Sequence, residues 1–118
     1  MKDFSSFSSD RLTPELKGIR KAVGQFDLVC PGTLLKRWKK CGRPNCRCQR
    51  DPKAIHGPYY EWSRYRAGRL VHNILTAGQA ALVQRGIANH QKIVTLLAQW
   101  GQETERIIGV TIRVKPRN

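Results

Sequence analysis

The chain has 118 residues, of which 22 are Lys or Arg and 8 are Asp or Glu, so its formal net charge is +14. This length allows one small domain with a modest core. The charge bias is too large to serve solubility alone and indicates an anionic partner, with nucleic acid first. No apolar run could span a bilayer and the N-terminus lacks a secretory pattern, so we expect no membrane contact and a cytoplasmic location.

The N-terminal part of the sequence predicts a tail followed by a helix. Residues 1–11 are rich in serine and are expected to form a flexible tail. Thr13 and Pro14 match an N-cap with proline at the first helical position, and apolar residues then recur on one face, which predicts a helix over about 14–26. A single small domain is expected over 12–110.

Three β-prone runs occupy the middle of the chain. The first covers 33–38, and the runs at 59–66 and 69–75 are divided by Ala67–Gly68, as in a hairpin. The cysteine-rich segment lies between the first two runs. The pattern predicts a three-stranded antiparallel sheet within 31–75, with a metal-binding loop between strands 1 and 2.

The segment 76–109 has helical spacing of apolar residues. Thr76 and Gln79 form a capping box at its start, and Gly86 with Asn89 is expected to break it into two helices, giving an α+β fold overall. The second helix would be about 30 Å long and would outreach a sheet of about 15 Å. We therefore expect a homodimer through the C-terminal helix, which a sedimentation-equilibrium mass would test. Residues 111–118 should form a basic tail.

Three cysteines and a histidine form a candidate metal site. Cys41, Cys46 and Cys48 have the spacing C-x4-C-x-C, with His56 in the same segment and Cys30 upstream. Thiolates and imidazole are the ligands of structural Zn²⁺, whereas the scarcity of carboxylates disfavours calcium and magnesium. Reduced thiols without metal, or an iron–sulfur cluster, are the alternatives. His56 is preferred to Cys30 as fourth ligand because it lies in the same loop.

Positive charge is concentrated around this site. Residues 31–72 contain eleven basic and two acidic residues, a local net charge of +9. Such a segment suits phosphate contacts, with DNA favoured over RNA. The candidate nucleic-acid-binding residues are Lys36, Arg37, Lys39, Lys40, Arg43, Arg47, Arg50, Lys53, Tyr59, Arg64, Arg66 and Arg69.

Aromatic residues alternate along the second predicted strand. Tyr60 and Trp62 should share one face and form core, while Tyr59 and Tyr65 should lie on the other face, available for contact. Exposed aromatics among basic residues can also stack with unpaired bases. Either tyrosine could in principle attack a phosphodiester, but no general base or nucleotide-binding motif accompanies it. We therefore expect no catalytic residues and no enzyme activity.

The sequence hypothesis is thus a zinc-stapled basic DNA-binding module. Two alternatives stay open. One is a binder of RNA or single strands that uses aromatic stacking, and the other is a regulatory module that docks on a protein partner through its long C-terminal helix.

The segments PGTLLKRWKKCGRPNCRCQ and HGPYYEWSR, followed by a glycine-centred turn, carry a family resemblance over about 31–75. They resemble small uncharacterised proteins of bacteria, archaea and mobile elements that share C-G-x-P-x-C-x-C followed by H-G-P-Y-Y. The resemblance implies that Cys41, Cys46, Cys48 and His56 form one local unit and leaves Cys30 outside it. The family has no settled function to carry over, and the resemblance implies that relatives sit near integrase or transposase genes. We therefore expect an accessory factor of a mobile element or recombination system.

Overall fold

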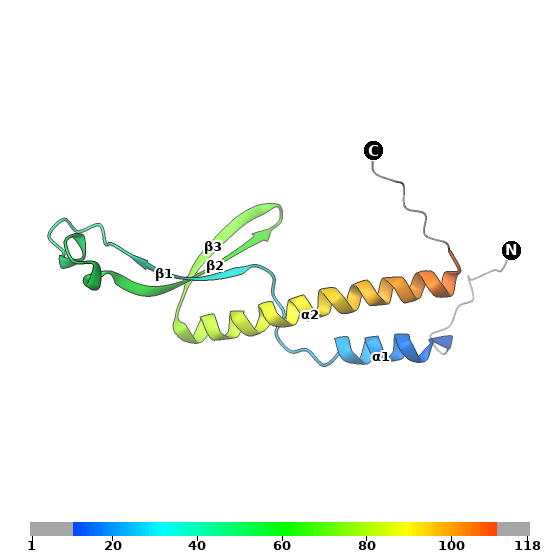
Figure 1. Cartoon of the computed structure of the whole chain (residues 1–118). Helices are drawn as coiled ribbons and strands as arrows, with labels where there is room; N and C mark the ends of the chain where they lie inside the picture. The colour runs from blue at the N-terminus through cyan, green and yellow to red at the C-terminus, as the bar shows by residue number, and fades with distance from the viewer. Residues whose placement is uncertain (1–10, 111–118) are drawn as a thin grey trace. The chain divides into compact units, whose positions relative to one another are not determined.

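The computed structural model describes residues 11–110 and has an α+β architecture (Figure 1). The expected tails at 1–11 and 111–118 lie outside the described residues, apart from Arg11. The elements in chain order are α1 (Pro14–Val23), β1 (Thr33–Lys39), the 3₁₀ turns η2 (Arg47–Gln49) and η3 (Pro52–Ala54), β2 (His56–Arg66), β3 (Arg69–Leu75) and α2 (Ala77–Ile108). The predicted fold class is confirmed.

The sheet is antiparallel, with the strands in the order β1-β2-β3. In the registers, Leu34 pairs with Trp62, and Trp62 pairs in turn with Asn73. The β2–β3 turn consists of Ala67 and Gly68, both with positive φ (53° and 78°), a two-residue turn whose twist suits a hairpin. Because the strands alternate in direction, the loop that contains the cysteines and the Ala67–Gly68 turn lie at opposite ends of β2 (Figure 1).

The two faces of the sheet differ in burial. The Trp62 face carries half-buried apolar and aromatic side chains, with Trp62 Nε1 donating to Pro31 O at 2.9 Å. It consists of Leu34, Lys36, Tyr60, Trp62, Arg64, Arg66, Arg69, Val71, Asn73 and Leu75. The Tyr59 face is more open, with Tyr59 at 37% and Tyr65 at 73% exposure. It consists of Leu35, Arg37, Tyr59, Glu61, Ser63, Tyr65, Leu70, His72 and Ile74.

The expected break at Gly86 and Asn89 is wrong, because α2 runs without interruption through both residues. The capping box is present: the Thr76 N–H donates to Gln79 Oε1 at 3.0 Å, and the Gln79 N–H donates to Thr76 Oγ1 at 3.1 Å. At 32 residues, α2 is about 48 Å long, well beyond the 30 Å expected.

Gly86 is needed for close packing rather than for a helix break. The N–H of Cys30 donates to Gly86 O at 3.2 Å, and a Cβ on Gly86 would lie 2.6 Å from Cys30 Sγ. Asn89 also contributes to this contact, because its Nδ2 donates to Leu28 O at 2.9 Å. The segment before the sheet is therefore fixed to α2 by the two residues that had suggested an interruption.

The described residues divide into two compact units. One comprises residues up to Phe26 together with those from Gln91 onward, and the other is Asp27–His90. In the first unit, α1 begins at the predicted N-cap, where the Leu16 N–H donates to Thr13 Oγ1 at 3.2 Å. Thr13 Oγ1 in turn donates to Glu103 Oε1 of α2 at 3.1 Å, and Leu16 is buried. The sheet and the cysteine-rich loop belong to the second unit.

Few apolar side chains are fully buried. Among residues 11–110 only Leu16, Cys48 and Ala80 form buried apolar core, whereas Leu82, Val94 and Leu97 of α2 are about half exposed. None of the described helices is long and apolar enough to cross a membrane. The homodimer through the C-terminal helix stays a prediction.

Replacing Gly86 by alanine tests the close packing against Cys30. Alanine in a helix interior is favoured over glycine by about 1 kcal/mol, whereas overpacking costs about 1–3 kcal/mol. We expect Gly86→Ala to lower the free energy of unfolding by about 1 kcal/mol in urea titrations.

Gly101→Ala is the matched control, because a Cβ at Gly101 meets nothing within 4 Å. It should raise the free energy of unfolding by up to about 1 kcal/mol. Adding Cys30→Ala to Gly86→Ala should recover part of the loss. Equal stabilisation by the two glycine substitutions would contradict the packing role of Gly86.

Candidate metal centre

The loop between β1 and β2 begins at an irregular point of the sheet. The register shifts between Arg37 and Lys39, and Lys39 pairs with His56, the first residue of β2. Gly57 follows with φ 141°, and a Cβ there would lie 2.9 Å from both Arg37 O and Trp38 Cδ1. A side chain cannot be accommodated at that position, so glycine lets the two strand ends approach closely where the loop begins and ends.

Short local hydrogen bonds fold the loop. The Cys46 N–H donates to Arg43 O at 3.2 Å, and the Gln49 N–H donates to Cys46 O at 3.1 Å, which forms η2. Asp51 caps η3 by accepting from the Lys53 N–H at 3.0 Å. The turns return the chain toward β2. Glycine, proline and asparagine favour turns, and the loop contains Gly42, Pro44, Asn45 and Pro52.

The loop brings the four predicted ligands together. One donor atom from each of Cys41, Cys46, Cys48 and His56 lies within 4.8 Å of all the others. Cys41 Sγ and Cys48 Sγ are 3.5 Å apart, and Cys46 Sγ is 3.2 Å from His56 Nε2. Cys41 and His56 are at the two strand ends, whereas Cys46 and Cys48 come from the first 3₁₀ turn and its N-cap. The cluster could hold a metal ion.

Two of the thiols differ in their acidity. The pKa of the Cys46 thiol is lowered to about 6, chiefly because the Cys48 N–H donates to its sulfur and secondly because His56 lies within hydrogen-bonding distance. Burial raises the pKa of the Cys48 thiol, whose residue is fully inaccessible to solvent. Cys46 would therefore be a thiolate near neutral pH, whereas Cys48 would have to lose its proton if a metal bound.

Two further contacts around the cluster were not predicted from the sequence. The Cys41 N–H donates to Cys48 Sγ at 3.3 Å, and Gln49 Nε2 donates to Cys41 O at 2.5 Å. An N–H bond to a thiolate stabilises its negative charge, and the glutamine ties the turn to the strand end. Nothing in the sequence pattern marks Gln49, because its role depends on the path of the loop.

Cys30 is placed away from the cluster. Its Sγ lies 3.7 Å from Val83 O on α2, and burial raises the pKa of its thiol. The structure thus brings His56, and not Cys30, to the three loop cysteines.

The predicted nucleic-acid-binding residues fall into two groups. Lys39, Lys40, Arg43, Arg50 and Lys53 are exposed around the loop, and within residues 11–110 none of them is in an ion pair. Arg47 is also exposed and pairs with Asp51 at 2.9 Å. Arg66 and Arg69 are exposed opposite each other beside the β2–β3 turn.

The remaining basic candidates are held by contacts within the sheet, and Tyr59 is partly exposed on the Tyr59 face. Arg37 pairs with Glu61 at 3.1 Å. The guanidinium of Arg64 lies 3.7 Å from the Trp62 ring centroid and donates to Asn73 Oδ1 at 2.5 Å. Lys36 lies 5.5 Å from the Trp38 ring. Arg64 is thus held against the Trp62 face by two contacts, and its predicted phosphate contact stays a prediction.

The chain belongs to the family described as Domain of unknown function (DUF6788), whose model matches residues 10–85. No curated protein and no solved structure matches the chain. The matched range includes α1, the whole sheet and all four residues of the cluster.

Metal analysis of purified protein tests the cluster. We expect one metal ion per chain, which Cys46→Ser should lose together with the order of the loop, because the cluster has few other interactions to hold it. Elemental analysis and circular dichroism would measure both effects.

Cys30→Ser is the matched control and should keep the metal. A freshly reduced wild-type protein that contains no metal after reconstitution, or equal metal content in the two variants, would contradict the assignment.

Proposed function

We propose that the chain is a zinc-stapled, basic DNA-binding module. The observation that carries this proposal is the position of the cluster: the four candidate ligands lie within 4.8 Å of one another inside the most basic segment of the chain. An ion bound there would fix the same backbone that presents the basic side chains. Metal binding and DNA binding would then be properties of one structural unit.

Zinc suits the donor set better than other metals. Three sulfurs and one imidazole nitrogen form a Cys₃His set, a common structural zinc site, and the cluster contains no carboxylate. A tetrahedral ion about 2.3 Å from each sulfur would hold sulfurs about 3.8 Å apart, close to the 3.5 Å between Cys41 Sγ and Cys48 Sγ. With all four positions filled by protein, such an ion would be structural and not catalytic.

The exposed loop cations provide the proposed phosphate contacts. Lys40, Arg43, Arg50 and Lys53 all lie between the end of β1 and the start of β2, and all are exposed. Asp51, the one acidic residue of this loop, accepts from Arg47 and caps η3. The field of the loop is therefore strongly positive, which favours association with a phosphate backbone regardless of base sequence.

The proposed role is that of a binding factor without its own catalytic chemistry. The tyrosines of the Tyr59 face lie beside Arg37, Glu61 and His72, which are joined to one another by contacts of 3.1 and 3.2 Å. That arrangement gives no tyrosine an obvious general base. The family resemblance supports a place beside the recombination machinery of mobile elements, which would supply the catalysis.

The salt dependence of duplex binding tests this function. If the loop neutralises about four phosphates, log affinity should fall with log salt concentration at a slope of about −3.6. Arg43→Gln should reduce the magnitude of that slope by about 0.9. Fluorescence anisotropy of a labelled duplex over a salt series would measure both values.

Lys21→Gln, on α1, is the matched control and should leave the slope unchanged, because its charge lies outside the sheet and loop. A binding curve indifferent to salt, or equal effects of the two substitutions, would contradict the proposal.

A further inference from the structure

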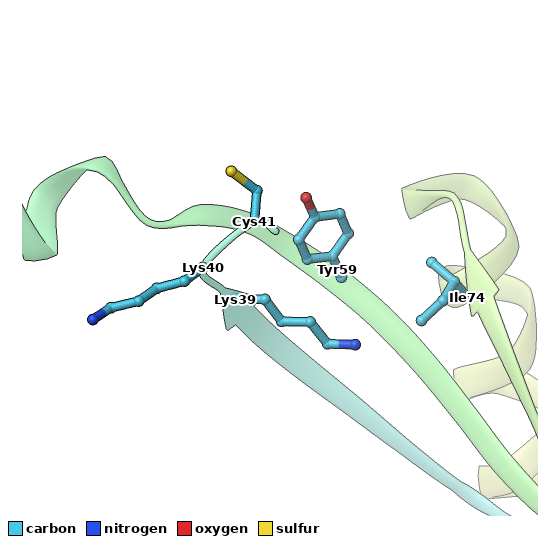
Figure 2. Close-up of a pocket in the computed structure, with 5 residues that line it drawn as sticks. All are labelled: Lys39, Lys40, Cys41, Tyr59 and Ile74. Carbon is cyan, nitrogen blue, oxygen red and sulfur yellow. The ribbon is translucent and has the colours of Figure 1, made fainter. Parts of the chain in front are cut away.

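A pocket opens on the Tyr59 face of the sheet (Figure 2), and Cys41 of the Cys/His cluster is one of its lining residues. It has a volume of about 270 Å³ and is lined by Lys39, Lys40, Cys41, Tyr59 and Ile74. Tyr59 belongs to β2 and Ile74 to β3, while the lysines and Cys41 lie at the end of β1 and the start of the loop. All three strands therefore contribute, and Cys41 links the pocket to the cluster.

The pocket combines apolar walls with positive charge. Figure 2 shows the Tyr59 ring between Cys41 and Ile74, with the Lys39 side chain extending past the ring toward Ile74. Lys40 points in the opposite direction. Tyr59 is 37% exposed and Ile74 is 56% exposed, so one ring and one branched aliphatic side chain remain accessible to a ligand.

This combination of apolar and positively charged side chains suits the binding of a single nucleotide. The exposed ring and Ile74 offer an apolar surface for a planar base, and bases stack on aromatic side chains with little dependence on sequence. Lys39 places an ammonium group at the same pocket, and Lys40 places another on the opposite side, where the neighbouring phosphate of a strand could lie. The volume lies just below the usual range for drug-sized ligands, which suits a single base.

A base in an intact duplex could not enter such a pocket. Paired bases are stacked between their neighbours, so the ring of Tyr59 can contact a base face only where the base is unpaired or has left the stack. The ligand that fits both the loop and the pocket is therefore DNA in which a duplex adjoins an unpaired nucleotide.

We propose that the pocket formed by Tyr59, Ile74 and Lys39 binds one unpaired DNA base while the basic loop contacts the adjoining duplex. This inference rests on the proposed DNA-binding function and adds a preference for junctions between duplex and single strand. It assigns a role to Ile74, which the sequence did not mark as a site residue.

The experiment compares three labelled DNA ligands at one salt concentration: a blunt duplex, the same duplex with a one-nucleotide overhang, and that duplex with an abasic overhang. The overhang with a base should bind about tenfold more tightly than the abasic one, since stacking on one aromatic side chain gives an effect of this order. The abasic ligand controls for the added phosphate. A 2-aminopurine base in the overhang should also lose fluorescence on binding.

Four substitutions on the Tyr59 face of the sheet separate the pocket from its surroundings. Tyr59→Ala should abolish the preference for the base-bearing overhang over the abasic one, whereas Tyr59→Phe should retain the preference. Tyr65→Ala is the matched control, because Tyr65 lies on the same face but outside the pocket. Ile74→Gln provides a second pocket variant, and the metal content of each variant reports whether its loop is intact.

The outcomes distinguish this inference from the proposed function. Equal affinity for the base-bearing and abasic overhangs, with salt-dependent binding of the blunt duplex, would overturn the pocket assignment and leave the proposed function standing. Failure to bind any of the ligands would overturn both. Tighter binding of a fourth ligand, the same duplex with a one-nucleotide RNA overhang, than of the DNA overhang would overturn the assignment to DNA.

Discussion

The loop between β1 and β2 holds like charges close together with almost no core beneath them. Between residues 40 and 55 there are five basic side chains and one acidic one, and Cys48 alone is buried. Repulsion among the cations and the lost chain entropy both oppose this conformation. A cation bound by the four donors would offset this cost. The donors are Cys41, Cys46, Cys48 and His56, which lie within 4.8 Å of one another. The proposed basic surface depends on that arrangement of donors.

Polar and aromatic contacts stabilise the sheet from which this loop extends. On the Tyr59 face, Glu61 lies between Arg37 and His72 with its side chain only 13% exposed. On the other face, the Arg64 guanidinium lies over Trp62, whose indole N–H bonds to Pro31 O. These contacts hold β1 and β2 together in the part of the sheet away from the loop, whereas at the loop end Lys39 pairs with His56.

Local sequence signals predicted the elements that depend on neighbouring residues. The Thr13 and Thr76 caps, the Ala67–Gly68 turn and the alternation along β2 were readable because caps, turns and strand faces are set within a few residues. The four cluster residues were found for the same reason, since they share one loop. His56 was preferred to Cys30 by proximity in sequence, and the structure places it with the three cysteines.

Features that depend on long-range contacts were not predicted. Gly86 suggested a helix break because glycine weakens a helix locally, but its role is to admit Cys30 from a distant segment. The stacking of the Arg64 guanidinium on Trp62 was not predicted either, because charge alone does not reveal such a contact. The pocket could not be predicted from the sequence, because Ile74 comes near Tyr59 only through the pairing of β3 with β2.

The central claim is that the metal site and the DNA-binding surface form one structural unit. The most direct test measures duplex affinity at a fixed salt concentration in three states: before metal removal, after metal removal and after zinc is restored. The account predicts that affinity falls when the metal is removed and returns when zinc is added. Unchanged duplex affinity in protein shown to be free of metal would contradict it.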